Sequence, residues 1–371
     1  MKILIAPDKF KGSLSAQEVC EAIGNGFKKN IPTIETIYHP MADGGDGSLE
    51  ILSKHLALKK QSVKTVDPIG REISTHYFTS SDAAFIEVAS ASGLVLLTQK
   101  ERSPLFTSTI GTGKMMADAL SKGFEKIYLF LGGSATNDAG MGIASELGFQ
   151  FLDKNKNELS PNGENLSKVK FIHSSPIFDF KKIEITLLCD VNNPMIGTNG
   201  AAHIYASQKG ATAEQVLLLN NGLINFSRIL NQHCKSNVSE LPGGGAAGAI
   251  GAGLVALLNA NLKKGFETIS QLTNLEKQIA AADWVISGEG KLDEQSLQGK
   301  VVNGIATLCE KYNKPLSLFV GKNELSKQQI KLLNTKSIFS ISEQTKDLED
   351  AMLNGEIYLR QLAMQFSPSL K

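Results

Sequence analysis

Short apolar runs alternate with helical patterns at both ends of the chain. Ile3 to Ala6 is an apolar run typical of a buried parallel strand, and apolar residues then recur at helical spacing from Val19 to Phe27. Further strands are predicted at 34–39, 284–287, 316–320 and 337–341, and helices at about 49–56, 301–311 and 346–364. Both ends therefore predict β-α units that share one doubly wound parallel sheet.

The middle of the chain predicts a second α/β domain. Strands are expected at 75–78, 84–88, 127–131 and 183–189, and helices at about 112–122 and 214–230. We therefore expect one discontinuous domain from 1–66 and 280–371, with a second α/β domain inserted at 67–279. A length of 371 residues agrees with two domains at roughly 150 residues each.

Composition and charge disfavour several classes of protein. Lys and Arg number 38 against 37 Asp and Glu, and a formal charge of +1 disfavours a nucleic-acid partner. The four cysteines are scattered without metal-ligand spacing, which favours reduced thiols in a cytoplasmic protein. The longest uncharged apolar stretch, residues 243–258, is shorter than the ~20 residues that span a bilayer. We expect a soluble enzyme with small-molecule substrates and no membrane partner.

Five loops rich in glycine and acidic or amide side chains follow predicted strands. They cover residues 8–13, 43–48, 132–138, 190–193 and 289–293. Ligands of open α/β sheets bind outside the carboxyl ends of strands. Glycines there offer backbone N–H groups to phosphate, and aspartates can hold Mg²⁺. One such loop is an ordinary turn, but five together favour a phosphate-handling enzyme.

The glycine triplet leaves other classes open. Gly243, Gly245 and Gly248 match the spacing of a dinucleotide-binding fingerprint, but no hydrophobic strand precedes them. A nicotinamide- or flavin-dependent oxidoreductase acting on a small hydroxy acid is therefore one alternative. A non-catalytic sensor of sugar acids on the same fold is another.

Seven sequence motifs follow one another along the chain: IAPDKFKGSLSA at 5–16, MADGGDGS at 41–48, GGSATND at 132–138, CDVNNP at 189–194, QKGA at 208–211, PGGGAAG at 242–248 and GEGKLD at 288–293. In type and order they resemble the motifs of the bacterial type I glycerate kinases. The resemblance covers nearly the whole chain. It implies an enzyme that uses ATP and Mg²⁺ to phosphorylate glycerate, giving 2-phosphoglycerate. It also implies a flavodoxin-like domain built from both chain ends, an inserted α/β domain and an active site between them.

These expectations assign roles to particular residues. Asp190 and Asp293 are the first candidates for the catalytic base or the Mg²⁺ ligand, and Glu289 is a further metal candidate. Lys11 is expected to neutralise charge during the transfer, together with Lys9 and Lys291. The remaining substrate- or nucleotide-binding candidates are Asp8, Asp43, Gly44, Gly45, Gly132, Gly133, Ser134, Thr136, Asn137, Asn192, Gly243, Gly244, Gly245 and Gly288.

Overall fold

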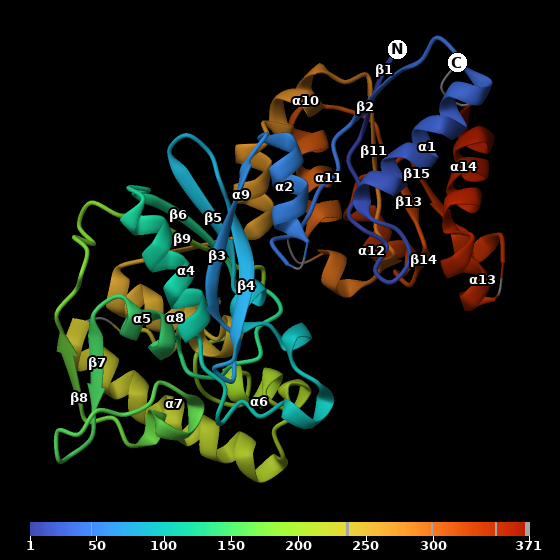
Figure 1. The fold of residues 1–371 in the computed structure, drawn as a ribbon. Helices are drawn as coiled ribbons and strands as arrows, with labels where there is room; N and C mark the ends of the chain where they lie inside the picture. The colour runs from blue at the N-terminus through green and yellow to red at the C-terminus, as the bar shows by residue number, and fades with distance from the viewer. Residues whose placement is uncertain (46, 235–236, 298–299, 346, 368–371) are drawn as a thin grey trace. The chain divides into compact units, whose positions relative to one another are not determined.

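The computed structural model describes all residues except 46, 235–236, 298–299, 346 and 368–371. The chain forms two units (Figure 1), one made of Met1–Asp43 with Phe266–Lys371 and the other of Gly44–Gly265. We predicted boundaries after residues 66 and 279. In the structure the second unit begins at Gly44 and ends at Gly265. The pairing of β3 (Lys59–Val66) along its length with β4 (Glu72–Thr79) places residues 59–66 in that unit.

The first unit is built on a parallel sheet whose described strands are ordered β15-β13-β11-β1-β2. Each pairing is parallel, and β1 is bonded on one side to β2 and on the other to β11. The strands are β1 (Lys2–Ile5), β2 (Glu35–Tyr38), β11 (Trp284–Ser287), β13 (Leu316–Val320) and β15 (Ser337–Ser340). The doubly wound α/β class is therefore confirmed, and the two chain ends share one sheet.

Helices cover both faces of this sheet (Figure 1). On one face, Phe27 of α1 (Ala16–Asn30) and Phe366 of α14 (Gly355–Phe366) pack with Phe319 of β13, because all three lie in one buried apolar cluster. On the opposite face lies α11 (Val301–Lys311). The other elements of the unit are α9 (Gly265–Leu272), α10 (Leu275–Ala281), α12 (Lys327–Lys331), α13 (Leu348–Leu353), β12 (Lys291–Leu292) and β14 (Lys322–Asn323).

Our prediction of a single C-terminal helix at about 346–364 is wrong in treating it as one continuous helix. The described residues form two helices, α13 and α14, that meet at Asn354, while the expected start at Lys346 lies outside the described residues. Asn354 has φ −106° and ψ 17°, and its side chain donates to Asp350 Oδ1 at 2.7 Å. Asparagine commonly bonds to nearby groups in this way, which competes with helical geometry.

The second unit contains a mixed sheet in the order β10-β9-β6-β5-β4-β3. The pairings from β10 to β5 are parallel, whereas β5, β4 and β3 pair antiparallel. The remaining strands of this sheet are β5 (Ala83–Glu87), β6 (Lys126–Phe130), β9 (Glu184–Leu188) and β10 (Asn261–Lys263). A separate antiparallel pair joins β7 (Phe149–Leu152) to β8 (Phe171–Ser174).

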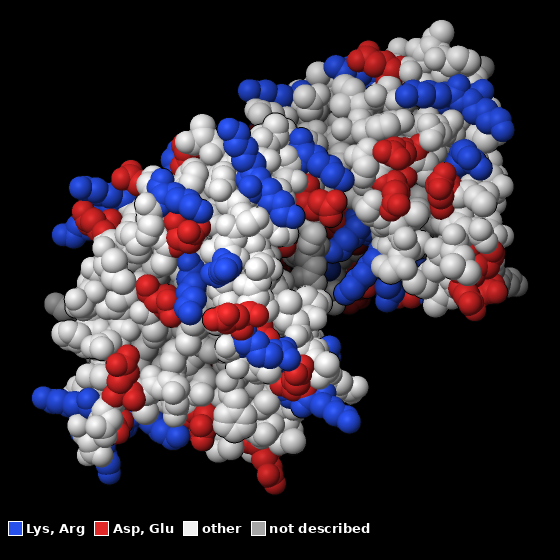
Figure 2. Space-filling model, in the orientation of Figure 1, with Lys and Arg blue, Asp and Glu red and all other residues white. Residues whose placement is uncertain are grey.

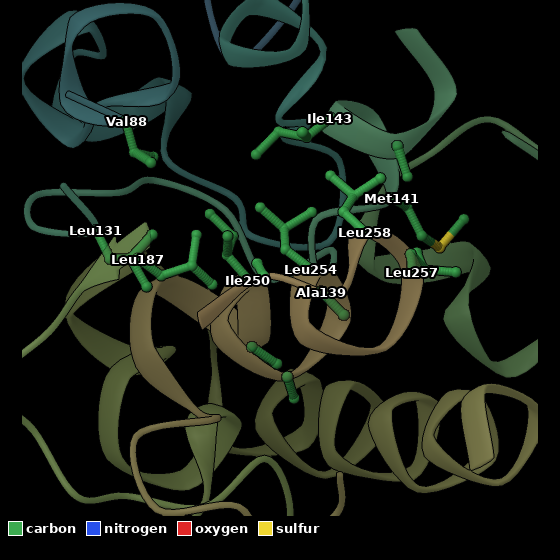
Figure 3. Close-up of a cluster of buried hydrophobic side chains, with 14 of the residues drawn as sticks. Val88, Leu131, Ala139, Met141, Ile143, Leu187, Ile250, Leu254, Leu257 and Leu258 are labelled. Atoms are coloured by element: carbon green, nitrogen blue, oxygen red, sulfur yellow. The ribbon is translucent and has the colours of Figure 1, made fainter. Parts of the chain in front are cut away.

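The core of this unit explains the long apolar stretch at 243–258. Most of it forms α8 (Ala246–Leu258), whose Ile250 and Leu254 are fully buried. Figure 3 shows them in a cluster with Ile143 of α5 and with Leu187 of β9. The helices of the unit are α2 (Ser48–His55), α3 (Ala89–Ser92), α4 (Ile110–Ser121), α5 (Met141–Glu146), α6 (Ala201–Tyr205), α7 (Ala213–Cys234) and α8.

The surface carries charges of both signs. Figure 2 shows acidic and basic side chains interspersed on the visible face of each unit, which agrees with the net charge of +1. Among the described residues, no helix combines the length and the apolar character needed to cross a bilayer.

Candidate active site

In the first unit, the acidic candidates lie beyond the carboxyl ends of β1, β2 and β11. Asp8 follows β1 and its N–H donates to the carbonyl of Gly288 at 2.8 Å, so the loops after β1 and β11 are joined directly. Gly288 has no room for a Cβ atom because the carbonyl oxygen of Phe319 lies against it. Asp43 follows β2 in the same parallel sheet. The sheet therefore brings Asp8, Asp43 and Glu289 to one edge.

Burial and neighbouring carboxylates raise the pKa values of Asp8 and Glu289. Burial raises the pKa of Asp8 to about 7, and the negative charges of Asp43 and Glu289 act in the same direction. Burial likewise raises the pKa of Glu289 to about 7, with smaller contributions from Asp293 and Asp43. Burial disfavours a charged carboxylate, and a second carboxylate nearby disfavours it further. A bound cation would remove both penalties.

Glu289 carries a buried oxygen that has no partner. Its Oε1 makes no hydrogen bond to any described residue, although Ser296 and Lys300 favour the charged form of the side chain and lower its pKa. A buried carboxylate oxygen without a donor is costly. Of the candidates in this unit, Glu289 has the clearest need for a ligand.

Asp293 has a backbone role at the start of the short helix η5 (Glu294–Leu297). Its Oδ1 accepts the N–H of Gln295 at 2.9 Å, and its own N–H donates to Ser296 Oγ at 3.0 Å. These bonds hold η5 in place, and η5 carries Ser296 to Glu289. Asp293 therefore fixes the start of η5 next to Glu289.

The lysine candidates of the first unit differ in their surroundings. Lys291 forms ion pairs with Glu324 at 2.8 Å and with Asp293 at 3.5 Å. Lys11 is exposed, whereas Lys9 is half-buried and donates its backbone N–H to Asp8 Oδ1 at 2.7 Å. Lys9 therefore lies beside Asp8, Lys291 is paired with Asp293 and Glu324, and Lys11 is exposed to solvent.

In the second unit, Asp190 follows β9 and lies where the chain enters and leaves the unit. Its Oδ1 accepts the N–H of Gly265 at 2.9 Å. A Cβ atom at Gly44, where φ is +90°, would lie 3.4 Å from its Oδ2. Gly44 and Gly265 are the first and last residues of the unit. Asp190 therefore binds one of these terminal segments through Gly265 and lies beside the other at Gly44.

Other candidates in these two loops are less enclosed. Gly45 accepts the hydroxyl of Ser48 at 2.6 Å through its carbonyl, at the start of α2. Asp46 lies outside the described residues. Asn192 is exposed two residues beyond Asp190.

The loop after β6 carries a set of buried polar side chains. Gly133 is exposed and Gly132 half-buried, but Ser134, Thr136 and Asn137 are at most 6% exposed. The hydroxyl of Thr136 and both amide atoms of Asn137 are buried without a hydrogen-bond partner among the described residues. Because nearly all buried polar groups in proteins are paired, this loop has capacity left for a ligand.

Lys209 completes this set, and the sequence analysis assigned it no role. The residue ends the short helix η4 (Ser207–Lys209) and is only 3% exposed. Its ammonium donates to Ser134 Oγ at 2.8 Å and to the carbonyl of Thr136 at 2.7 Å. Burial lowers the pKa of Lys209 to about 7, while nearby Asp138 opposes the shift. Lys209 lies in the motif QKGA, which was noted in the sequence, but nothing in the pattern of that motif predicts that its lysine is buried.

Asp138 itself has a structural role. It is fully buried, and its Oδ2 accepts from the N–H of Thr109 at 2.8 Å and from its hydroxyl at 2.7 Å. Weaker bonds join it to the N–H groups of Gly140 and Gly142 at 3.2 and 3.3 Å. The carboxylate thus holds the start of α5 against the residue that precedes α4.

The glycine-rich loop before α8 packs against the loops after β6 and β9. Gly245 donates its N–H to the carbonyl of Asn193 at 2.9 Å, and Gly248 accepts from the N–H of Ala139 at 3.0 Å. Ala247, Gly248 and Ala249 have φ values of 54°, 73° and 70°, so three successive residues are left-handed. Such strain in non-glycine residues concentrates at functional sites. At Gly248 a Cβ atom would also collide with the carbonyl of Thr136.

The donor groups of the described residues do not form a preassembled metal cage. No cluster of three or more His, Cys, Asp or Glu side chains in the described part of the chain could hold a metal ion by itself. Mg²⁺ in phosphoryl-transfer sites commonly takes only one or two carboxylates, with the rest of its ligands from phosphates and water.

Comparisons with known proteins identify the family. The model of the glycerate kinase family matches residues 3–371. Glycerate kinase of Halalkalibacterium halodurans is 37% identical over 97% of this chain and 96% of its own length. Glycerate 2-kinase of Escherichia coli is 40% identical over 85% of this chain and 84% of its own length.

A solved structure agrees in fold along the whole chain. The crystal structure of a Salmonella typhimurium LT2 protein assigned as glycerate kinase 2 superposes with a TM-score of 0.86, at 36% identity, and covers 100% of this chain and 98% of its own. The comparisons give no support to an oxidoreductase or a sensor. This chain belongs to the glycerate kinase family, phosphotransferases that act on an alcohol group of glycerate with ATP as phosphoryl donor.

Proposed function

We propose that the enzyme transfers the γ-phosphoryl group of ATP, bound with Mg²⁺, to O2 of D-glycerate and releases 2-phosphoglycerate. The observation that carries the proposal is the group of carboxylates after β1, β2 and β11, where Glu289 Oε1 is buried without a partner. The choice of O2 rests on the similarity to the protein named glycerate 2-kinase in Escherichia coli.

The residues at this edge suit a hard divalent cation. Oxygen ligands are what Mg²⁺ prefers, and the raised pKa values of Asp8 and Glu289 express a local excess of buried negative charge. Glu289 and Asp8 would hold the ion, with Asp43 beside them. When bound, Mg²⁺ supplies charge neutralisation for the phosphate oxygens of ATP.

The protein's own groups have three tasks in this reaction. Asp190 accepts the proton of the attacking hydroxyl, a role that calls for a carboxylate held in a fixed position. Lys9, Lys11 and Lys291 neutralise charge on the phosphates, and Asp293 holds η5 and with it Ser296. The loops at 132–137 and 243–248 bind the substrates through backbone N–H groups and small polar side chains.

The test is a coupled ATPase assay across small hydroxy acids, followed by phosphorus NMR of the product. We expect turnover with D-glycerate and a phosphomonoester at C2. A product phosphorylated at C3 would refute the choice of O2. Turnover that persists after chelation of divalent cations would refute the role of Mg²⁺.

A further inference from the structure

The unpaired amide of Asn137 is better matched by the hydrogen-bonding groups of one substrate of the proposed reaction than by those of the other. An amide side chain presents a donor, Nδ2, and an acceptor, Oδ1. Neither atom has a hydrogen-bond partner among the described residues, and the side chain is fully buried. A polyphosphate near neutral pH offers almost only acceptors, so it would satisfy Nδ2 and leave Oδ1 unpaired. A hydroxy acid offers both, because its carboxylate accepts and its hydroxyl donates.

The charge next to Asn137 also matches a carboxylate. Lys209 directs two N–H donors to Ser134 Oγ and the carbonyl of Thr136, and an ammonium has three. The neighbouring hydroxyl of Thr136 is buried and unpaired as well. A single carboxylate suits one buried lysine, whereas a triphosphate carries several more charges than this position could neutralise.

The main-chain geometry around the cluster is consistent with a fixed binding position. Gly248, the middle residue of the left-handed stretch 247–249, packs against Thr136 and Asn137, and its carbonyl accepts the N–H of Ala139. A loop clamped in this way holds its side chains in place before a ligand arrives, which reduces the entropy lost on binding. Exposed Gly133 and half-buried Gly132 form the solvent side of the loop.

We propose that Lys209, Ser134 and Asn137 bind glycerate, with its carboxylate accepting from Lys209, Ser134 and Asn137 Nδ2. Its C3 hydroxyl donates to Asn137 Oδ1, which leaves the C2 hydroxyl for Asp190. This assignment rests on the proposed function, and it places the acceptor substrate, rather than ATP, on the second unit. The lowered pKa of Lys209 supports it, because a buried ammonium that lacks a full counter-charge gains from an anion.

The experiment is calorimetric titration of the full-length enzyme, with D-glycerate alone and, separately, with ATP in the presence of a chelator. Lys209→Met removes the charge, and Asn137→Leu replaces the amide by an apolar group of the same shape. Each should weaken D-glycerate binding by about 10- to 100-fold, the range for a hydrogen bond to a charged group. The affinity for ATP should stay within about twofold, because the triphosphate does not use these groups.

Thermal melts separate binding from folding. Asn137→Leu removes an unpaired buried amide, so its melting temperature should match or exceed that of the parent. The matched control is Asn165→Leu in the same unit. The Asn165 amide donates to the carbonyl of Ser160 at 2.9 Å and accepts from Lys168 at 2.9 Å. This control should lower the melting temperature and leave D-glycerate binding unchanged.

The outcomes are distinct. If both variants keep the parent's affinity for D-glycerate, or if they weaken ATP instead, the assignment is overturned while glycerate kinase activity stands. If Asn137→Leu melts well below the parent, the amide is structural and the assignment also falls. If the parent binds D-glycerate as described but forms no phosphorylated product, the proposed function fails and the binding position stands. Should Lys209→Met fail to fold, Asn137→Leu and Ser134→Ala decide the question by the same titrations.

Discussion

Each unit buries ionisable groups at loops that follow the strands of its sheet. The buried groups are acidic in the first unit, whereas the second unit buries a basic group. In the first unit, Asp8 and Glu289 lie beyond the carboxyl ends of parallel strands, and burial raises their pKa values to about 7. In the second unit, Lys209 lies against the loop after β6, and burial lowers its pKa to about 7. Burial penalises the charged form of either sign. The first edge therefore gains from a cation and the second cluster from an anion.

This difference suggests that each unit binds a different substrate. Buried carboxylates in the first unit suit the Mg²⁺ complex of a nucleotide. A buried lysine next to an unpaired amide in the second unit suits a hydroxy acid. Each unit would then be specialised for one substrate by the sign of its unbalanced charge. The predictions below test each side of this comparison.

The largest expected effect concerns Asp190, on the side of the acceptor substrate. Asp190→Asn keeps an acceptor for the N–H of Gly265 but removes the negative charge. Loss of a catalytic base typically lowers kcat by about 10²- to 10⁴-fold, and a Mg²⁺ titration of the variant should not restore it. Steady-state kinetics with D-glycerate and ATP measure the change.

The control for Asp190 is Asp153→Asn in the same unit. Asp153 also accepts backbone N–H groups, from Asn155 at 2.7 Å and Asn157 at 2.9 Å, and lies at a turn outside the candidate site. It should keep the parent's kcat. If Asp190→Asn melts normally and stays within about threefold of the parent, far below the usual loss for a base, Asp190 does not accept the proton.

On the metal side, Glu289→Gln should raise the Mg²⁺ concentration needed for half-maximal activity by at least about tenfold. The variant keeps a carbonyl oxygen but loses the charge that attracts the ion, so excess Mg²⁺ should recover part of the rate. Glu294→Gln is the control, since Glu294 is exposed in η5 and accepts from Gln329 at 3.0 Å. Equal Mg²⁺ dependence in both variants would remove Glu289 from the metal site.

The two units also differ in how much of their secondary structure could be predicted from the sequence. α11 occupies 301–311, the range that was predicted for it. In contrast, β3 was not predicted. Its residues KKQSVKTV are mostly polar because it is an edge strand with much of its surface exposed.

The two sides of the candidate site were predicted unequally. Asp8, Asp43 and Glu289 were among the candidates, behind Asp190 and Asp293, because each acidic loop follows an apolar strand, and parallel pairing brings such loops to one edge. Lys209 follows no strand, and its contact with Ser134 joins residues 75 positions apart. Only the packed structure distinguishes this lysine from the many exposed ones. The unpaired atoms of Asn137 are likewise a property of packing.

A smaller effect is expected in the pH dependence of stability. The raised pKa values of Asp8 and Glu289 mean that the folded state binds more protons than the unfolded state from about pH 4 to about 7. Stability therefore falls as pH rises through that window, by up to about 1.4 kcal/mol per pH unit for each proton. Asp8→Asn should flatten this slope and raise the melting temperature at pH 8, where the parent carries the repelling charge.

Lys209 contributes with the opposite slope. Its pKa is lowered from 10.5 to about 7 on folding, so the unfolded state binds the extra proton between those values and stability rises with pH. Asp138 is the charged neighbour that limits the shift. Melts of the parent, Asp8→Asn and Lys209→Met from pH 5 to about 9 separate the two contributions. Identical slopes in all three proteins would contradict the comparison.

The smallest effect should come from the exposed charges near the first edge. Glu324 pairs with Lys291 at 2.8 Å and with Lys322 at 2.9 Å, yet both lysine side chains are more than half exposed, at 54% and 60%. Solvent screens such pairs, so their net contribution to stability is small. Glu324→Gln should therefore leave the melting temperature within about 2 °C of the parent at every pH tested, and added salt should make no further difference. A large loss on this substitution would mean that Lys291 depends on its partners as strongly as the buried groups do. The contrast between buried and exposed charge that underlies the comparison would then fail for the first unit.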